Sequence, residues 1–208
     1  MTELPKKQTP HSGRNWKEYL GEAILIVFSV VLALFLTEEI NNRKERQQTN
    51  EIIKNIQEEV TRNKKAAEEQ YHYHLQVLRN IDSALKTPAF LQQIVTNGEF
   101  HLNLIADQGV LYRYLNKPAW EVAKSHDILS KIDFSTAALL TRIYDEQDRI
   151  MKVEDEIAQV IFDRESRKPT NTRETLLLIR DNYRGWAVDR VPVLLRSYEE
   201  AVKDLARY

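Results

Sequence analysis

Glu69 and His72 have the spacing at which two side chains of one helix approach the same metal ion. Di-iron helical bundles use this Glu-x-x-His pattern twice and add two more inward-facing glutamates. The sequence holds no second copy of the pattern. His74 falls on another helix face than His72, and His101 and His126 lack local partners at the spacing of a structural metal site. We therefore expect Glu69 and His72 to be polar surface residues, and we expect no metal site.

Other residue types that do chemistry are present without the spacing that catalysis needs. The chain has no cysteine, no Gly-x-Ser-x-Gly turn and no glycine-rich phosphate loop. The acidic pairs Asp145/Glu146 and Glu154/Glu156 are typical of solvated helix faces. The sequence thus predicts no catalytic residue, no cofactor-binding residue and no cofactor, and we expect a protein that is not an enzyme. An enzyme whose site forms only in the fold is the alternative.

Two further groups of residues are candidates for binding surfaces. The basic residues near Pro169 suit either a solvated loop, which we favour, or contact with anionic lipid or an acidic partner; they are Arg164, Arg167, Lys168 and Arg173. The large aromatic residues are expected to lie mostly in the core, with an exposed partner-binding patch as the alternative. They are Tyr112, Tyr114, Trp120, Tyr183, Trp186 and Tyr198.

Residues 19–37 are the candidate membrane span. Residues 23–36 are apolar apart from Ser29, and Glu22 lies close enough to one end to reach the headgroups. Trp16 and Tyr19 stand where an aromatic belt would lie. A buried core helix and a cleavable signal peptide are the alternatives. The lack of a polar stripe disfavours the first, and the lack of a small-x-small site after the apolar run disfavours the second.

Orientation follows from the flanks of the span. Residues 1–18 form a short basic tail, and the tail and the segment after the span each carry four Lys or Arg residues. A short basic tail is not easily translocated, so we expect it in the cytoplasm and the following domain on the other side. Ser29 and Ala33 form one small-xxx-small pair, which is expected to face lipid. Packing of that face on a transporter or channel is the alternative.

Composition favours one all-α domain after the span. The 208 residues include 30 Lys or Arg and 31 Asp or Glu, a balance that argues against a nucleic-acid partner. Five glycines and six prolines leave few breaks, and alternating strand patterns are nearly absent. Residues 38–208 are therefore expected to form one soluble helical domain.

Prolines and apolar periodicity divide this domain. Residues 38–86 predict a stalk and first helix, 89–132 short helices, 135–166 a long helix, and 173–206 a long helix kinked or split near Gly185 and Pro192. Among the short helices we include residues 100–115. Asp133 or Ser135 is expected to cap the long helix, and Asn171 with Glu174 resembles a capping box. An antiparallel helical bundle is the simplest packing.

One irregularity in the first helix concerns its apolar stripe. Ile56, Val60 and Ala67 recur at helical spacing, but Asn63 and Lys64 fall where an apolar residue would help packing. The stripe is therefore predicted to be thin over its first half.

Two blocks of the sequence resemble a widespread group of bacterial single-span membrane proteins, the DUF6090-like proteins of Bacteroidetes and relatives. The first block is residues 22–27 with Arg43, Arg46 and a Glu59…Asn63 segment, and the second is residues 120–125 with a following Leu140…Tyr144. His126 departs from the group, where a small residue is expected. The resemblance implies a bacterial envelope protein, and it implies no activity, catalytic residue or cofactor. Together with the orientation argued from the flanks, we expect a span in the bacterial inner membrane and a periplasmic domain.

The sequence thus favours a membrane-anchored helical domain that acts through protein–protein contacts, as a scaffold, an accessory subunit or a sensor. The expected partners are the lipid bilayer and either another protein or a second copy of the chain. An accessory subunit of a transporter or channel is the second hypothesis.

Overall fold

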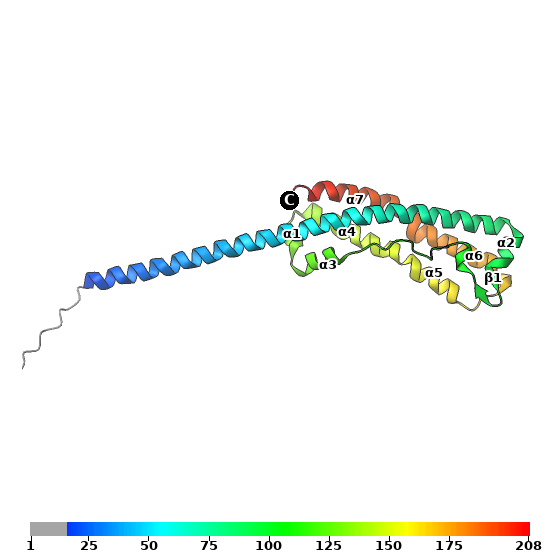
Figure 1. The fold of residues 1–208 in the computed structure, drawn as a ribbon, viewed down its shortest axis with the longest axis horizontal. Helices are drawn as coiled ribbons and strands as arrows, with labels where there is room; N and C mark the ends of the chain where they lie inside the picture. The colour runs from blue at the N-terminus through cyan, green and yellow to red at the C-terminus, as the bar shows by residue number, and fades with distance from the viewer. Residues whose placement is uncertain (1–15) are drawn as a thin grey trace, which may run out of the picture. The chain divides into compact units, whose positions relative to one another are not determined.

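The computed structural model describes residues 16–208, apart from the side chain of Glu18, and most of them are helical (Figure 1). The predicted basic tail therefore lies almost wholly outside the described residues. The chain divides into two compact units, Met1–Gln48 and Thr49–Tyr208. One helix, α1 (Trp16–Lys86), supplies residues to both units. The all-α prediction is confirmed, with a single two-residue hairpin as the exception among the described residues.

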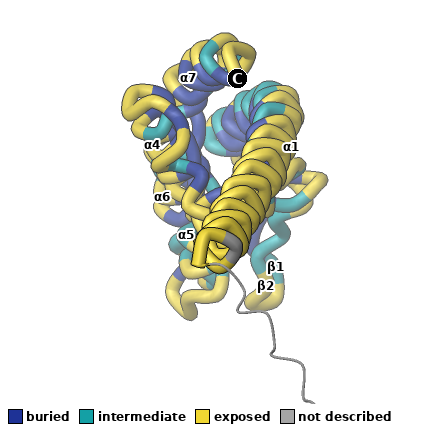
Figure 2. Tube along the Cα trace, turned by 90° about the vertical axis from the view of Figure 1, so that its left-hand side faces the viewer, coloured by how far each residue is buried: buried dark blue, intermediate teal, exposed yellow. Residues whose placement is uncertain are grey.

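The part of α1 in the first unit carries the predicted span. It is the one helix among the described residues that is long and apolar enough to cross a membrane. None of the residues in its most apolar stretch is buried, as Figure 2 shows by colour. This exposure disfavours the alternative of a buried core helix, because a core helix would be covered by the rest of the chain.

Prolines begin the next helices, as predicted. α1 ends at Lys86, and α2 (Pro88–Ile94) and α3 (Pro118–Ser125) each have proline in the first turn. Proline is favoured there because its missing N–H has no partner in a helix start and its fixed φ already suits a helix. α4 (Phe134–Met151) is capped by Asp133, whose Oδ1 accepts the Thr136 N–H at 3.0 Å. This confirms one of the two predicted caps.

The predicted helix over residues 100–115 is wrong. Strands β1 (Val95–Thr96) and β2 (Glu99–Phe100) pair around Asn97 and Gly98, with φ of +54° and +76°. Two positive φ angles in a two-residue loop are typical of a type I′ hairpin. One short 3-10 turn, η1 (Leu102–Leu104), follows. Residues 105–117, which we call the strap, then run without helix or strand to Pro118.

The C-terminal third contains two interruptions. The predicted long helix is divided by Lys152 into α4 and α5 (Val153–Phe162), although no proline or glycine lies there. The last helix is split into α6 (Thr172–Asn182), a π-helical turn η4 (Tyr183–Val188) and α7 (Val191–Leu205). The Asp189 N–H reaches back five residues to the Arg184 carbonyl at 3.0 Å, so the wider turn absorbs the break before Pro192. The sequence left open whether this helix is kinked or split near Gly185 and Pro192, and the structure shows a split.

The capping box at Asn171 and Glu174 is wrong. Asn171 precedes α6 but its side chain makes no capping bond to that helix. Its Nδ2 instead donates to the Glu165 carbonyl at 3.1 Å, across the short turn η3 (Pro169–Asn171). The Asn171 side chain therefore stabilises the loop before α6 and does not cap the helix.

Three helical columns make up most of the second unit: α1, then α4 with α5, and then α6 with α7. The direction of each column follows from contacts between side chains. From α1, Glu59 contacts Tyr144 and Asn63 contacts Gln147, so α1 and α4 run parallel. Two parallel neighbours need a return segment between them, and the strap is the part of the chain that supplies it (Figure 1).

The third column, α6 to α7, runs antiparallel to α1. Lys64 pairs with Glu199 at 3.0 Å and Asp82 with Arg180 at 3.6 Å, so residue numbers rise on one helix as they fall on the other. The predicted antiparallel packing thus holds for this pair, and also for α4 with α7, where Glu146 meets Arg190. The parallel pairing of α1 with α4 differs from this prediction.

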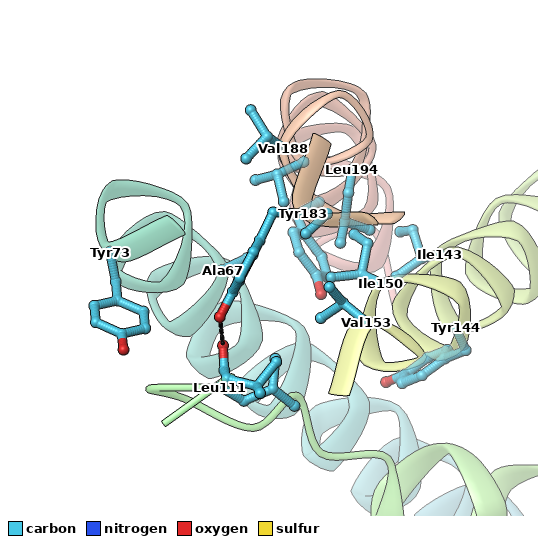
Figure 3. Close-up of a cluster of buried hydrophobic side chains, with 14 of the residues drawn as sticks. Ala67, Tyr73, Leu111, Ile143, Tyr144, Ile150, Val153, Tyr183, Val188 and Leu194 are labelled. Atoms are coloured by element: carbon cyan, nitrogen blue, oxygen red, sulfur yellow. Dashed lines mark hydrogen bonds between the residues drawn. The ribbon is translucent and has the colours of Figure 1, made fainter. Parts of the chain in front are cut away.

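The core lies between the columns (Figure 3). Fully buried side chains come from α1, α4, η4 and α7, and include Ile56, Ile143, Ile150, Tyr183 and Leu194. Trp120 packs face to face on Tyr144, with 4.6 Å between ring centroids. The expectation that the aromatic residues are core holds for Trp120, Tyr183 and Tyr198, whereas Trp186 and Tyr112 are partly buried and Tyr114 is exposed.

Candidate functional site: a strap held by polar side chains of α1

A row of polar side chains on α1 faces the strap. Four of its members are almost completely buried, from 0% exposure for His74 to 2% for Asn63 and Gln70. Buried polar groups are costly unless they are hydrogen-bonded. We call this set the polar row, and it consists of Glu59, Asn63, Gln70, Tyr73, His74 and Asn80.

Asn63 binds the main chain of the strap through both ends of its amide. Its Oδ1 accepts the Asn116 N–H at 3.0 Å, and its Nδ2 donates to the Asn116 carbonyl at 2.6 Å. A neighbouring β-strand would offer the same donor and acceptor pair. The asparagine that interrupts the apolar stripe in the sequence is therefore buried and makes a specific main-chain contact.

Gln70 and His74 form the middle of the row. The Arg113 N–H donates to Gln70 Oε1, which fixes the amide so that Gln70 Nε2 points at His74 Nε2. From this network we assign His74 Nε2 as the acceptor and Nδ1 as the protonated nitrogen. The Val110 carbonyl lies 3.2 Å from His74 Nε2. In this assignment it accepts a hydrogen bond from the Tyr183 hydroxyl, at 3.4 Å, and none from the histidine.

Burial decides the charge of His74. The ring is fully buried, and its Nδ1 has no hydrogen-bond partner. It packs edge-on against the Tyr183 ring, with 5.0 Å between the two ring centroids. Burial disfavours the charged form and lowers the pKa of His74 from 6.5 to about 4. The Val110 carbonyl, which could accept a hydrogen bond only from a protonated Nε2, opposes this shift in part. The imidazole is therefore neutral at pH 7 and holds Gln70 in place.

At one end of the row, Tyr73 and Asn80 bind the start of the strap. The Tyr73 hydroxyl donates to the Gly109 carbonyl at 2.6 Å and accepts the Gln108 N–H at 3.2 Å. Asn80 Nδ2 donates to the Ile105 carbonyl at 3.0 Å. Gly109 has a φ of +82°, a conformation that glycine adopts without strain. The glycine therefore lets the chain turn toward the tyrosine.

At the other end, Glu59 closes the helix that follows the strap. Its carboxylate accepts the N–H groups of Ala119 at 2.8 Å and Trp120 at 3.3 Å, at the start of α3. Lys117, the residue before α3, makes no side-chain capping bond. A carboxylate near a helix start is favourable because the first amides lack partners and carry partial positive charge. Glu59 thus caps a helix from 60 residues away.

Tyr144 completes the surroundings of Glu59. Its hydroxyl donates to Glu59 Oε1 at 2.7 Å. The pKa of Tyr144 is raised far above its usual value, first by burial and then by this hydrogen bond, so the phenol stays protonated and remains a donor. The carboxylate, only 1% exposed, therefore has three donors, which is what a buried charge requires.

A shallow groove of about 280 Å³ opens beside Glu59, between α1 and α3. Ile52, Arg62 and Val122 contribute to its lining. Both oxygens of Glu59 are already bonded to the protein. The arrangement therefore positions main chain and offers no free general base to this groove.

The contacts follow one register. As positions on α1 rise from Glu59 to Asn80, their partners fall from Trp120 to Ile105, so strap and helix run antiparallel. Most of the bonds reach main-chain N–H or C=O groups, which every residue except proline presents alike. The polar row can therefore bind an extended segment largely independently of that segment's side chains.

The residues that the sequence singled out for chemistry do not come together. Glu69 pairs with Arg113 at 2.7 Å, and His72 is exposed. Within residues 16–208, no group of three or more His, Asp or Glu side chains is arranged to hold a metal ion. Glu69 and His72 accordingly behave as polar residues at the edge of the strap and on the surface.

One member of each acidic pair, and three residues of the basic loop, contact other parts of the chain. Glu146 binds Arg190 at 3.0 Å, and Glu154 accepts the Tyr114 hydroxyl at 3.0 Å. In the loop, Arg167 donates to the Ile161 carbonyl and Lys168 pairs with Glu165. Arg173 donates to the Leu85 carbonyl at the end of α1. These contacts agree with a solvated loop that also closes helix ends.

The polar row was missed by reasoning from sequence, although a signal was present. Glu59, Asn63, Gln70 and His74 are separated by four, seven and four residues, which is the spacing of the apolar stripe itself. Polar residues placed on a core face point to buried hydrogen bonds with a segment that has no ladder of its own. The partner segment could not be identified without the fold.

Comparisons of the chain with protein-family models, with curated proteins and with solved structures find no match. Function is therefore argued from the geometry of the chain itself.

Proposed function

We propose that the chain is a single-pass membrane protein whose helical domain acts through contact with another protein. The observation that carries the proposal is α1, where one uninterrupted helix joins an exposed apolar stretch to the polar row of the domain. An apolar surface of this length is stable only when lipid or protein covers it. The resemblance to the DUF6090-like proteins supports a bacterial envelope protein, and the short basic tail supports an inner-membrane span with the domain in the periplasm.

Hydroxyl groups in the apolar stretch support lipid contact. Ser29 donates to the Leu25 carbonyl and Thr37 to the Ala33 carbonyl, each at 2.8 Å. Such bonds back to the helix satisfy polar groups where water is absent. Because Ser29 is bonded within its own helix, the Ser29/Ala33 face has no need of a polar partner from another span. This favours a lipid-facing anchor over an accessory subunit that packs through this face.

The domain itself supports a role in contact rather than in chemistry. The buried polar side chains described above bind the chain's own main chain, and Glu59 does so with both oxygens. Groups used in this way fix the position of the strap on α1 and are not available to a substrate. A membrane-held domain of this kind suits a scaffold, an accessory subunit or a sensor.

The test is affinity capture after crosslinking in native membranes, with full-length protein and two variants. Ala33→Leu alters the small-residue face of the span, and Thr141→Leu is a matched change on an exposed helix position of the domain. We expect one reproducible partner at constant stoichiometry for the wild type and for Ala33→Leu. If Ala33→Leu loses the partner and Thr141→Leu keeps it, the lipid-facing anchor is refuted and the accessory-subunit hypothesis is supported. A full-length protein that captures nothing reproducible would end it.

Orientation is tested separately by protease protection in intact cells and in spheroplasts. We expect the domain to be cleaved only after the outer barrier is opened. Cleavage of the tail under the same conditions, with a protected domain, would reverse the proposed orientation. Alkaline carbonate extraction gives the control, because an integral span stays with the membrane.

A further inference from the structure

We propose that the groove between α4 and α7 is a binding site for a small zwitterion, namely a dipeptide with an apolar side chain. The groove has a volume of about 270 Å³, and all its lining residues belong to the second unit. Pockets for drug-sized ligands hold about 300–1,000 Å³, so this groove accepts a smaller molecule. The inference goes beyond the proposed function, because it gives the domain a ligand at a site that is separate from the span.

The groove has an apolar floor beside a break between helices. Ile143 of α4 and Leu194 of α7, both labelled in Figure 3, are each 1% exposed, and Val193 adds an apolar wall that is 52% exposed. The groove begins where the π-helical turn η4 ends and α7 starts. π-Helical turns occur frequently at functional sites. The floor therefore offers apolar contact to a ligand side chain at a position of this kind.

Ser197 supplies a polar group that a ligand can bond. The residue lines the groove and is only 9% exposed, and the described structure records no hydrogen bond for its hydroxyl. A hydroxyl removed from water is costly unless it is hydrogen-bonded. The amide of a dipeptide presents both a donor and an acceptor to such a hydroxyl.

The charged residues of the groove leave one cation and one anion for a ligand. Arg190 and Glu146 pair with each other at 3.0 Å. Arg142, whose side chain is 66% exposed, has a single recorded ion pair among the described residues, a 4.0 Å contact with Glu200. The described structure records no ion pair for the Asp189 carboxylate. A carboxylate at Arg142 and an ammonium at Asp189 therefore complement the groove.

The separation of these two charges sets the length of the ligand. Arg142 lies at the Ser197 end of the groove, since its guanidinium reaches Glu200, whereas Asp189 lies at the other end. Asp189 and Ser197 are eight residues apart, which is about 12 Å along a helix. Ion pairs of about 3 Å at each end leave about 6 Å between the charged groups of the ligand. Two residues of extended chain span at most about 7 Å, so a dipeptide matches this distance.

The probe is alanyl-leucine, titrated by calorimetry into the full-length chain in detergent micelles. We expect one bound peptide per chain, with a Kd of about 0.1–1 mM for a ligand of this size. Arg142→Met and Asp189→Asn are each expected to weaken binding about fivefold, because each removes one solvent-exposed ion pair. Arg196→Met is the matched control, since Arg196 is an exposed arginine of α7 that does not line the groove.

Changes to the peptide test the same two contacts from the ligand's side. N-acetylation removes the ammonium, so Asp189→Asn should have no further effect on that peptide. C-terminal amidation removes the carboxylate, so Arg142→Met should have no further effect on that one. Helical circular dichroism checks that both variants are folded.

Three results would overturn the proposal. They are no binding at peptide concentrations far above the expected Kd, equal binding of the free and the blocked peptides, and undiminished binding by the two folded variants. If the dipeptide fails to bind while membrane capture still yields a partner, only the groove is excluded and the proposed function stands. If it binds and capture yields no partner, the proposed function fails and the groove remains.

Discussion

Glu59→Gln is the substitution that most sharply tests the role of the buried carboxylate. The glutamine has nearly the same shape, but it has one acceptor oxygen and an NH₂ group in place of the second. At Glu59 the two oxygens accept from Ala119, Trp120 and Tyr144. In the variant the NH₂ group must face one of these donors, so a buried donor loses its partner.

The size of the effect follows from the contacts. A buried donor left without a partner costs about 1–3 kcal/mol. The remaining hydrogen bonds are no longer made to a charged acceptor, and their weakening lowers the free energy of unfolding by about 1 kcal/mol more. We therefore expect Glu59→Gln to lower the free energy of unfolding by about 2–4 kcal/mol. Neutralising a buried charge acts in the opposite direction, but here the charge has three donors and its removal leaves them unmatched.

The assay is urea unfolding of the full-length chain in detergent micelles, followed by helical circular dichroism. Glu58→Gln is the matched control, because Glu58 is exposed and pairs with Arg62 at 3.6 Å. Its expected effect is below about 1 kcal/mol. Amide hydrogen exchange at Ala119 and Trp120 reports the same contact locally and should become faster in Glu59→Gln only. Equal stabilities for the two variants, or a more stable Glu59→Gln, would refute the reasoning.

Two further predictions concern pH and glycine. The pKa of His74 is about 4 when folded and 6.5 when free, so the unfolded chain binds a proton that the folded chain does not between these values; stability is full above pH 6.5, falls as pH drops from 6.5 to 4, by about 2 kcal/mol at pH 5, and levels off below pH 4. Urea midpoints at pH 7 and 5 should show this loss in the wild type and in His72→Gln but not in His74→Gln; an unchanged wild-type midpoint would contradict it. Gly98→Ala should destabilise by about 1 kcal/mol because its φ is +76°, whereas Gly185→Ala, in a helical turn with open space, should be neutral or stabilising. Thermal unfolding of both variants checks the opposite signs.

Local signals predicted the helix boundaries that depend on single residues. Proline after Thr87 and after Lys117, and aspartate at position 133, act within one turn of the chain, so their effects are visible in sequence. The split near Pro192 was predictable for the same reason. The π-helical form of that split was not, because it depends on how η4 packs its buried residues such as Tyr183 against the other helices.

The strap was not predictable because its hydrogen bonds are distant in sequence. Its apolar residues, among them Ile105 and Leu111, resemble a helical pattern when only neighbours are considered. Asn63 and Gln70 supply its main-chain partners from 53 and 43 residues earlier, and these contacts replace a ladder. Polar residues on a core face looked like a weakness of α1 for the same reason. Their partners belong to the fold and not to the local sequence.

The most direct test of the account is residue-resolved amide hydrogen exchange across residues 105–117 in the full-length chain. The polar row binds the amides of Gln108, Arg113 and Asn116, whereas the described structure records no hydrogen bond for those of Tyr112 and Tyr114. We predict slow exchange at the first three and fast exchange at the other two. Uniform protection over four or more consecutive amides would indicate a helix in this segment and would contradict a strap held by side chains of α1.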